Sequence, residues 1–264
     1  MKKIEIRSMK PLILVVNDDG ITAPGIRALL EVMVDFGDVY VVAPDSPQSG
    51  MGHAITLNTT LRAEKVSFGE GAVEEYSCTG TPVDCVKLAV NNLLPRKPDL
   101  IVSGINHGSN SSINVIYSGT MSAAMEGALE GIPSIGFSLL DTRREADFTV
   151  SKEVVKVIVN NVLENGMPAD ICLNVNIPVV SQAELKGIKI CRQARGNWEE
   201  EFDERLDPNK RSYYWLTGSF VNYDKGEDTD IWALENKYVS VVPVQFDLTA
   251  HHSIQKLNTW NYEF

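Results

Sequence analysis

The sequence lacks the marks of several large protein classes. Its four cysteines, in 264 residues, show no Cys-x-x-Cys spacing. Buried free thiols in a reducing compartment are therefore favoured over a disulfide framework or a zinc site. No apolar run approaches the length of a membrane span, and the N-terminal "MKKIEIRSMK" has no apolar core of a signal peptide. We expect a cytoplasmic protein with no membrane association.

Positive charge is also scarce. The chain has 24 Lys and Arg against 35 Asp and Glu, a formal net charge of -11. This balance argues against a nucleic-acid polymer as partner, because such binding needs a basic face. A small anionic substrate is still compatible, since one bound cation reverses the local field in a pocket.

Two nucleotide-binding motifs are missing as well. There is no G-x-x-x-x-G-K-S/T phosphate loop, and no G-x-G-x-x-G follows the first apolar run. A nucleoside triphosphatase and a dinucleotide-dependent dehydrogenase are therefore disfavoured.

The chain does contain alternating strand and helix patterns. Continuous apolar runs predict strands at 11–16, 39–44, 99–105, 133–139 and 171–178. Between them, helices are predicted over 26–33, after an N-cap at Thr81, over 119–131 and over 149–164. This alternation predicts an α/β fold: a Rossmann-like, open, mostly parallel sheet with helices on both faces.

The residue pattern changes after about residue 180. Alternating aromatic and polar residues predict antiparallel strands and hairpins, and 249–260 could form a short terminal helix. We expect one domain over 1–264, with a core of about 9–190 and a β-rich extension of about 191–264.

Polar residues follow the predicted strands at one end. "LILVV" runs into Asn17-Asp18-Asp19-Gly20, and the polar stretches 43–53 and 103–120 follow two further strands. In open α/β sheets, sites form beyond the carboxyl ends of the strands. The converging side chains carry oxygen ligands of the kind that Mg²⁺ and Mn²⁺ prefer. A bound cation would also relieve the repulsion between adjacent carboxylates.

A second feature lies in the third of these stretches. Ser118-Gly119-Thr120 stands where the helix of 119–131 begins, and helix N-termini bind phosphate groups. A cation beside such a phosphate site indicates phosphoryl transfer or hydrolysis.

Each motif alone has a simpler interpretation. Asp18-Asp19-Gly20 could be a turn with an Asx cap, Asn106 could cap a loop, and Ser118 could be a plain N-cap. His53 is interpreted as a loop residue, and His251 and His252 as surface or packing residues. The functional hypothesis therefore depends on the convergence of three strand ends.

Several ordered segments together resemble the SurE (stationary-phase survival protein) family. They are "ILVVNDDGITAPGI", "VVAPDSPQSGMGHAITL", "GTPVDCVKLA", "DLIVSGINHGSN", "YSGTMSAAMEG" and, later, "DTDIWALENKYVSVVPVQFD". The resemblance implies a metal-dependent phosphatase that acts on nucleoside 5′- or 3′-monophosphates, and in some members on short polyphosphate. It also implies a Rossmann-like core and a homodimer or homotetramer with exchanged C-terminal elements.

The resemblance also implies site residues. The family's ligands for one divalent cation fall on Asp18, Asp19, Ser49 and Asn106, of which the two aspartates are also catalytic. Its phosphate-contacting positions fall on Asn110, Ser118, Gly119 and Thr120. Many members have Gly where this chain has Ser112, and the usual start of the family matches Met9, so residues 1–8 could be an upstream start or an added segment.

Together these features predict a phosphohydrolase for nucleoside monophosphates that uses Mg²⁺ or Mn²⁺. The alternative is a non-catalytic regulatory protein that binds a nucleotide or a metal in the same pocket.

Overall fold

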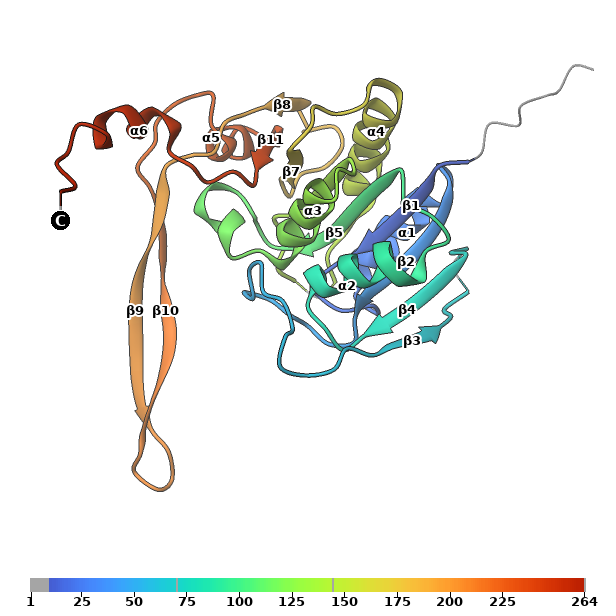
Figure 1. Cartoon of the computed structure of the whole chain (residues 1–264), viewed down its shortest axis with the longest axis horizontal. Helices are drawn as coiled ribbons and strands as arrows, with labels where there is room; N and C mark the ends of the chain where they lie inside the picture. Colours follow the sequence, from blue (N-terminus) through green and yellow to red (C-terminus); the bar gives the residue numbers. More distant parts are fainter. Residues whose placement is uncertain (1–9, 70, 144, 264) are drawn as a thin grey trace, which may run out of the picture.

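The computed structural model describes residues 10–69, 71–143 and 145–263. The expectation about residues 1–8 falls outside these ranges. A nine-stranded sheet runs through the main body of the molecule (Figure 1). In spatial order its strands are β3 (Ala63–Val66), β4 (Glu74–Cys78), β2 (Asp38–Pro44), β1 (Leu12–Val16), β5 (Leu100–His107), β6 (Ser134–Leu139), β7 (Ile171–Ile177), β11 (Val239–Gln245) and β8 (Ile188–Ile190).

Most neighbouring strands of this sheet are parallel. Only the pairs β3–β4 and β7–β11 are antiparallel. Every residue of β1 and of β6 is buried, as expected for strands covered on both faces. The α/β fold with a mostly parallel sheet is therefore confirmed.

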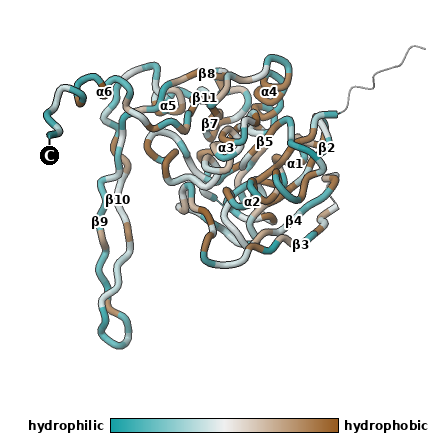
Figure 2. The backbone as a smooth tube through the Cα atoms, viewed as in Figure 1, coloured by the Kyte–Doolittle hydropathy of each residue, from teal (hydrophilic) through white to brown (hydrophobic). Residues whose placement is uncertain are grey.

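Helices cover both faces of the sheet. The helices are α1 (Pro24–Met33), α2 (Pro82–Leu88), the π-helical turn η1 (Ala89–Leu93), the 3₁₀ turn η2 (Ser112–Ile116), α3 (Gly119–Leu129), α4 (Thr149–Asn165), α5 (Asp230–Glu235) and α6 (His251–Leu257). Apolar residues of α1 and α4 share one core cluster with one face of the strands. Residues of α2 and α3 contribute to a cluster on the other face. Figure 2 shows hydrophobic residues concentrated in this body.

Local sequence signals explain where helices begin. Thr81 caps α2, accepting a hydrogen bond from the backbone N–H of Asp84, while the Asp84 side chain accepts one from the backbone N–H of Thr81. Pro82 occupies the first helical position, where its missing N–H costs nothing.

All four cysteines are buried and free, as the sequence predicts.

The last third of the chain differs in part from the prediction. The expected antiparallel strand occurs as β11, which pairs with β7 inside the main sheet. Residues Asp230–Glu235, expected as strand, instead form α5, because Thr229 caps a helical turn by accepting from the backbone N–H of Trp232. The predicted terminal helix is confirmed as α6. None of the described helices combines the length and apolarity needed to cross a membrane.

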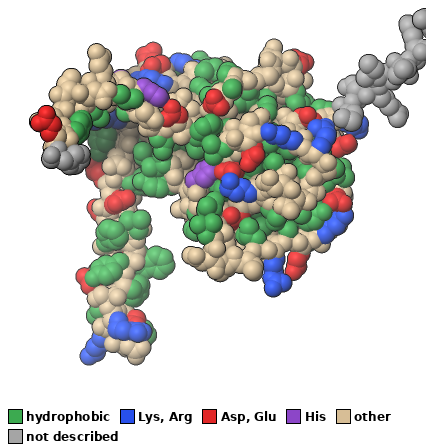
Figure 3. Space-filling model, viewed as in Figure 1, with side chains coloured by type: hydrophobic (Ala, Val, Ile, Leu, Met, Phe, Trp, Pro, Cys, Tyr) green, Lys and Arg blue, Asp and Glu red, His purple; other side chains and the backbone are tan. Residues whose placement is uncertain are grey.

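The expected hairpin consists of β9 (Gly196–Leu206) and β10 (Ser212–Asn222). These two strands form a sheet of their own and project away from the body, with α6 and the C-terminal residues beyond their base (Figure 1). Figure 3 shows hydrophobic side chains along this projecting arm. Tyr213, Tyr214 and Trp215 are exposed on it.

Candidate active site

The carboxyl ends of neighbouring strands bring the predicted residues together. Strand β1 lies between β2 and β5, so the segments that follow these strands meet at one edge of the sheet. A pocket of about 320 Å³ opens there. Its lining includes Asp18, Ser49, Asn106, Asn110 and Ser118 from the predicted set, together with Gly50, His107, Ser109, Asn114, Tyr117 and Trp198.

Asp18 lies at the buried floor of this site, with 4% of its surface exposed. The Thr120 hydroxyl donates a hydrogen bond of 2.5 Å to its Oδ1. Burial raises the pKa of Asp18 to about 6; the hydrogen bond from Thr120 opposes this shift, and the charge of Asp19 adds to it. The carboxylate is therefore costly to ionise without a positive partner.

Gly119 allows helix α3 to approach this carboxylate. A Cβ atom at residue 119 would lie only 2.7 Å from the Cβ of Asp18, so no other residue fits without a shift. The backbone of Thr120 also lowers the pKa of Asp18. Because the first N–H groups of a helix lack partners within the helix, the end of α3 favours negative charge at this point.

Ser118 performs the capping role that its sequence position suggests. Its Oγ accepts a hydrogen bond of 3.0 Å from the backbone N–H of Met121. Ser118 also lines the pocket, so its hydroxyl hydrogen can still be donated to a ligand. The simple N-cap interpretation and a phosphate contact are thus compatible.

Asp19 contacts a residue that the sequence analysis passed over. Its Oδ2 lies 3.4 Å from the ring Nδ1 of His107 and 3.4 Å from the backbone nitrogen of the same residue. The His107 ring packs edge-on against Phe148, with ring centroids 5.3 Å apart. The sequence signal that could have identified His107 is its position directly after Asn106, a predicted cation ligand.

The other two predicted cation ligands are placed by backbone contacts. The Asn106 amide nitrogen donates to the carbonyl of Gly108 at 2.9 Å, which leaves its amide oxygen as an acceptor. The backbone N–H of Gln48 donates to the carbonyl of Asp18 at 2.7 Å. This bond holds the loop of Ser49 against the end of β1.

Asn110 is held by a network of buried polar side chains from strands β6 and β7. Its backbone N–H donates to Asn176, its side chain donates to Ser138, and its carbonyl accepts from Asn174, each at 2.8 Å. One of its two amide hydrogens is therefore already used. The network fixes the loop between β5 and α3 in one position.

Comparison with known proteins identifies the family of this chain. The family model "Survival protein SurE" matches residues 13–200. The chain belongs to the SurE family. A 5′-nucleotidase SurE from Flavobacterium psychrophilum is 67% identical over 252 residues, 96% of this chain and 98% of the relative. A 5′-nucleotidase SurE from Christiangramia forsetii is 67% identical over 253 residues, 96% and 97% of the two chains.

A solved SurE structure has the same fold. The crystal structure of the SurE protein from Aquifex aeolicus matches with a TM-score of 0.81 at 42% identity, covering 94% of this chain and 98% of that one. In this chain, the backbone at Ser112 has a φ of 54°. That left-handed conformation is the one glycine adopts most readily.

The donor set of this SurE site fits a hard divalent cation. The described residues contain no group of three or more His, Cys, Asp and Glu side chains arranged to hold a metal. Support for a cation comes instead from the chemistry of the donors: two adjacent carboxylates, a hydroxyl and an amide oxygen suit Mg²⁺ or Mn²⁺, which bind oxygen and keep several waters.

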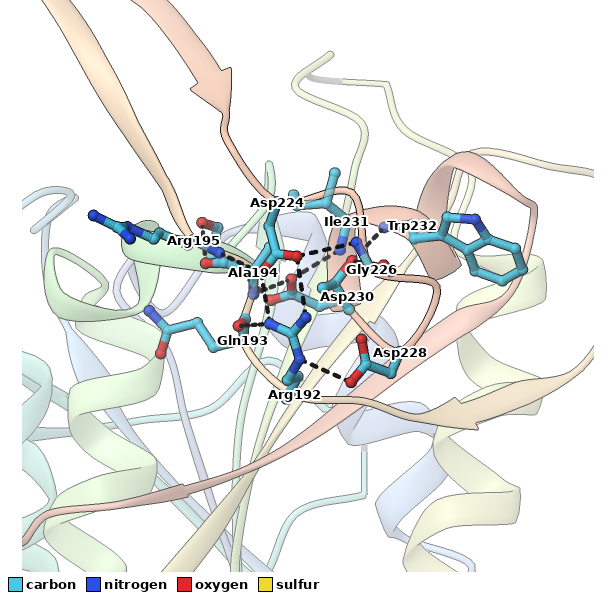
Figure 4. Close-up of polar contacts among 12 residues, drawn as sticks. Arg192, Gln193, Ala194, Arg195, Asp224, Gly226, Asp228, Asp230, Ile231 and Trp232 are labelled. Atoms are coloured by element: carbon cyan, nitrogen blue, oxygen red, sulfur yellow. Dashed lines mark hydrogen bonds and ion pairs between the residues drawn. The ribbon is translucent and has the colours of Figure 1, made fainter. Parts of the chain in front are cut away.

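A second buried aspartate, outside the predicted set, ties the site to the hairpin. Asp230 accepts hydrogen bonds from the backbone N–H groups of Ser112 at 2.7 Å, Ala194 at 2.9 Å and Ile231 at 2.8 Å (Figure 4). Burial raises its pKa, while these hydrogen bonds oppose the shift. It thereby joins the active-site loop to the start of β9.

Beside Asp230, an ion-pair cluster closes the base of the hairpin. The Arg192 guanidinium contacts Asp224 at 2.5 and 3.0 Å and Asp228 at 2.8 Å (Figure 4). Asp224 also accepts from the backbone N–H groups of Arg195 and Gly226. Long-range contacts of this kind carry no local sequence signal.

Proposed function

We propose that this chain is a divalent-metal-dependent 5′-nucleotidase, a phosphoric monoester hydrolase that releases phosphate from nucleoside 5′-monophosphates. The observation that carries the proposal is the pocket in which Asp18, Ser49 and Asn106 meet the N-terminus of α3. Relatives that are 67% identical to this chain bear the name 5′-nucleotidase SurE. Nucleoside 3′-monophosphates and short polyphosphate are proposed as further substrates.

One cation per subunit, Mg²⁺ or Mn²⁺, is proposed for this site. The residues that would hold it are Asp18, Asp19, Ser49 and Asn106. When bound, it neutralises charge on the phosphoryl oxygens and polarises the phosphorus for attack.

The protein itself supplies orientation. Residues Ser118, Gly119 and Thr120 would direct the hydroxyl and N–H groups at the start of α3 toward the phosphate. Asn110, fixed by its amide network, would contact the same group. Such preorganised donors stabilise developing charge without reorganisation. Hydrolysis of a phosphate monoester requires a barrier reduction on the order of 20 kcal/mol, more than any single hydrogen bond provides.

Released phosphate tests the proposal. The metal-free chain is assayed with nucleoside 5′- and 3′-monophosphates, short polyphosphate and an aryl phosphate, with and without added Mg²⁺ or Mn²⁺. We expect hydrolysis of 5′-monophosphates that a chelator abolishes and either cation restores. Full activity without metal would contradict metal dependence. Tight nucleotide binding with no turnover would favour the non-catalytic regulatory alternative.

We further propose that the chain forms a homodimer or homotetramer through residues after about 191, which serve as an oligomerisation extension of the single domain. Large apolar side chains there are exposed, including Phe202 at 66%, Leu248 at 89% and Trp260 at 57%. Exposed apolar surface of this kind commonly marks an interface.

The four buried free thiols fit a reducing compartment, and we propose the cytoplasm as the location of the protein.

A further inference from the structure

A second pocket adjoins the candidate active site. It has a volume of about 530 Å³ and lies between the hairpin and the body. Three residues, Gly50, Tyr117 and Trp198, line both pockets. A molecule with its phosphate in the first pocket therefore extends into the second through a shared boundary.

The walls of this second pocket suit a flat aromatic ring. Trp198 is held in place, because its indole N–H donates to the Asn114 side chain at 2.8 Å and its ring packs edge-on against Phe220. Tyr117 offers a second aromatic surface and Leu216 an apolar one. Aromatic side chains bind nucleobases by stacking, whatever the base.

One glycine lines the pocket from strand β10. Gly218 stands opposite Glu200 in the hairpin register, with a φ of 139°. A Cβ atom there would lie 2.3 Å from the carbonyl oxygen of Glu199. A side chain at residue 218 would therefore press on the backbone of β9 next to Glu200, and glycine lets the two strands pair closely beside the pocket.

Glu200 is the charged residue among those that line this pocket. It shares a face of β9 with Trp198, two residues away. Within the described residues, its side chain has no hydrogen-bond or ion-pair partner. An ionised carboxylate only accepts hydrogen bonds, and it binds two adjacent donors best.

We propose that this second pocket binds the nucleobase of the substrate and prefers guanine. Guanine presents N1–H and the 2-amino group side by side, so both donors can reach the two oxygens of Glu200. Adenine offers an acceptor next to its single amino group, and hypoxanthine lacks the 2-amino group. This inference rests on the proposed nucleotidase function and deepens it.

The test compares kcat/KM for GMP, IMP, AMP and ribose 5-phosphate in the full-length protein with Mg²⁺ or Mn²⁺. We expect GMP to exceed IMP by about tenfold, the effect of one charge-assisted hydrogen bond. The substitution Glu200→Gln removes one acceptor oxygen and should abolish that ratio. Glu201→Gln, the same charge change on the opposite face of the hairpin, should keep it.

Two further measurements complete the test. Trp198→Ala should raise KM for every nucleotide by about tenfold relative to ribose 5-phosphate. Guanosine, which has no phosphate, should inhibit ribose 5-phosphate hydrolysis competitively and better than inosine. Equal rates for GMP and IMP, or a GMP preference retained by Glu200→Gln, would overturn the inference. Hydrolysis of no substrate at all would instead refute the nucleotidase proposal.

Discussion

The main sheet and the β9–β10 hairpin are both built from β-strands, yet they bury their residues very differently. All five residues of β1 are buried, whereas the eleven residues of β9 are exposed or at most half-buried. The main sheet is covered by helices on both faces, while the hairpin has no such cover within the described part of the chain (Figure 2). An isolated two-stranded hairpin is marginally stable on its own.

The difference separates two roles. The body fixes the residues that meet at the edge of the sheet, because its core leaves them no other arrangement. The hairpin contributes Trp198 to that pocket and otherwise exposes apolar side chains. The contrast therefore suggests that chemistry depends on the body and that assembly depends on the hairpin and the terminal arm.

The largest expected effect is on chemistry in the body. Asp18→Asn should lower phosphatase activity by about 100-fold or more, because it weakens the proposed cation site. The metal-free variant should be no less stable than the parent, since a buried carboxylate has lost its charge. Added Mn²⁺ should raise the melting temperature of the parent much more than that of the variant.

A matched control is available at the other end of the sheet. Asp38 is an exposed residue at the start of β2, so Asp38→Asn makes the same charge change away from the site and should retain activity. Equal Mn²⁺-induced shifts in melting temperature for Asp18→Asn and the parent would show that Asp18 is not a ligand.

The second prediction compares packing directly. Leu29 of α1 is fully buried, and Leu206 of β9 is 62% exposed. Leu29→Ala should lower the free energy of unfolding by about 2–5 kcal/mol, and Leu206→Ala by less than about 0.5 kcal/mol. Urea unfolding of the dilute protein measures both. A comparable loss in Leu206→Ala would mean that another chain covers the hairpin.

The third prediction concerns assembly. Light scattering at micromolar concentration should show at least a dimer for the intact chain. Truncation after Asp247 removes α6 and the exposed Leu248 and Trp260, and it should weaken this assembly. A monodisperse intact monomer would refute the assembly proposal. A dimer that survives truncation would place the main contact in the hairpin.

The smallest expected effect is on the pH dependence of stability, at Asp230, which links the active-site loop to the hairpin. Burial raises the pKa of Asp230 above its ordinary 3.8, so the folded protein binds this proton more tightly than the unfolded chain. Stability from this group is therefore greatest below pH 3.8 and is lost as the pH rises through the raised value. The Asp230→Asn variant has no carboxyl group at this position, so it should not lose stability in this way as the pH rises.

Urea unfolding at a series of pH values between 4 and 7 measures this difference. The stability advantage of the parent over Asp230→Asn should shrink as the pH rises. An advantage that grows instead would show that the hydrogen bonds to Asp230 outweigh its burial.

Much of the body could be predicted because its signals are local. The capping box at Thr81, Pro82 and Asp84 depends on neighbours within one helical turn. The apolar run of β1 and the helical spacing of α1 likewise reflect residues close in the chain. The convergence of the predicted site residues followed from a general rule, that parallel strands end at the same edge of a sheet.

Two of the missed features depend on residues far apart in the chain. The hydrogen bond between Ser112 and Asp230 joins residues 118 positions apart, and the contact between His107 and Asp19 joins residues 88 apart. No local pattern records such pairs, because they form only when the whole chain has closed. The short helix α5 was missed for a local reason, because its six residues, mostly apolar, lie among strand-like residues.

By itself, the sequence determined the α/β class, the order of the elements in the body, and the oxygen-rich segments that follow β1, β2 and β5. These properties depend on side-chain periodicity and on the residues next to each strand. Only the tertiary structure decided that Trp198 reaches the pocket, that β11 enters the main sheet beside β7, and that Asp230 joins the active-site loop to the hairpin. Those outcomes depend on which distant surfaces pack together, and packing is a property of the folded chain as a whole.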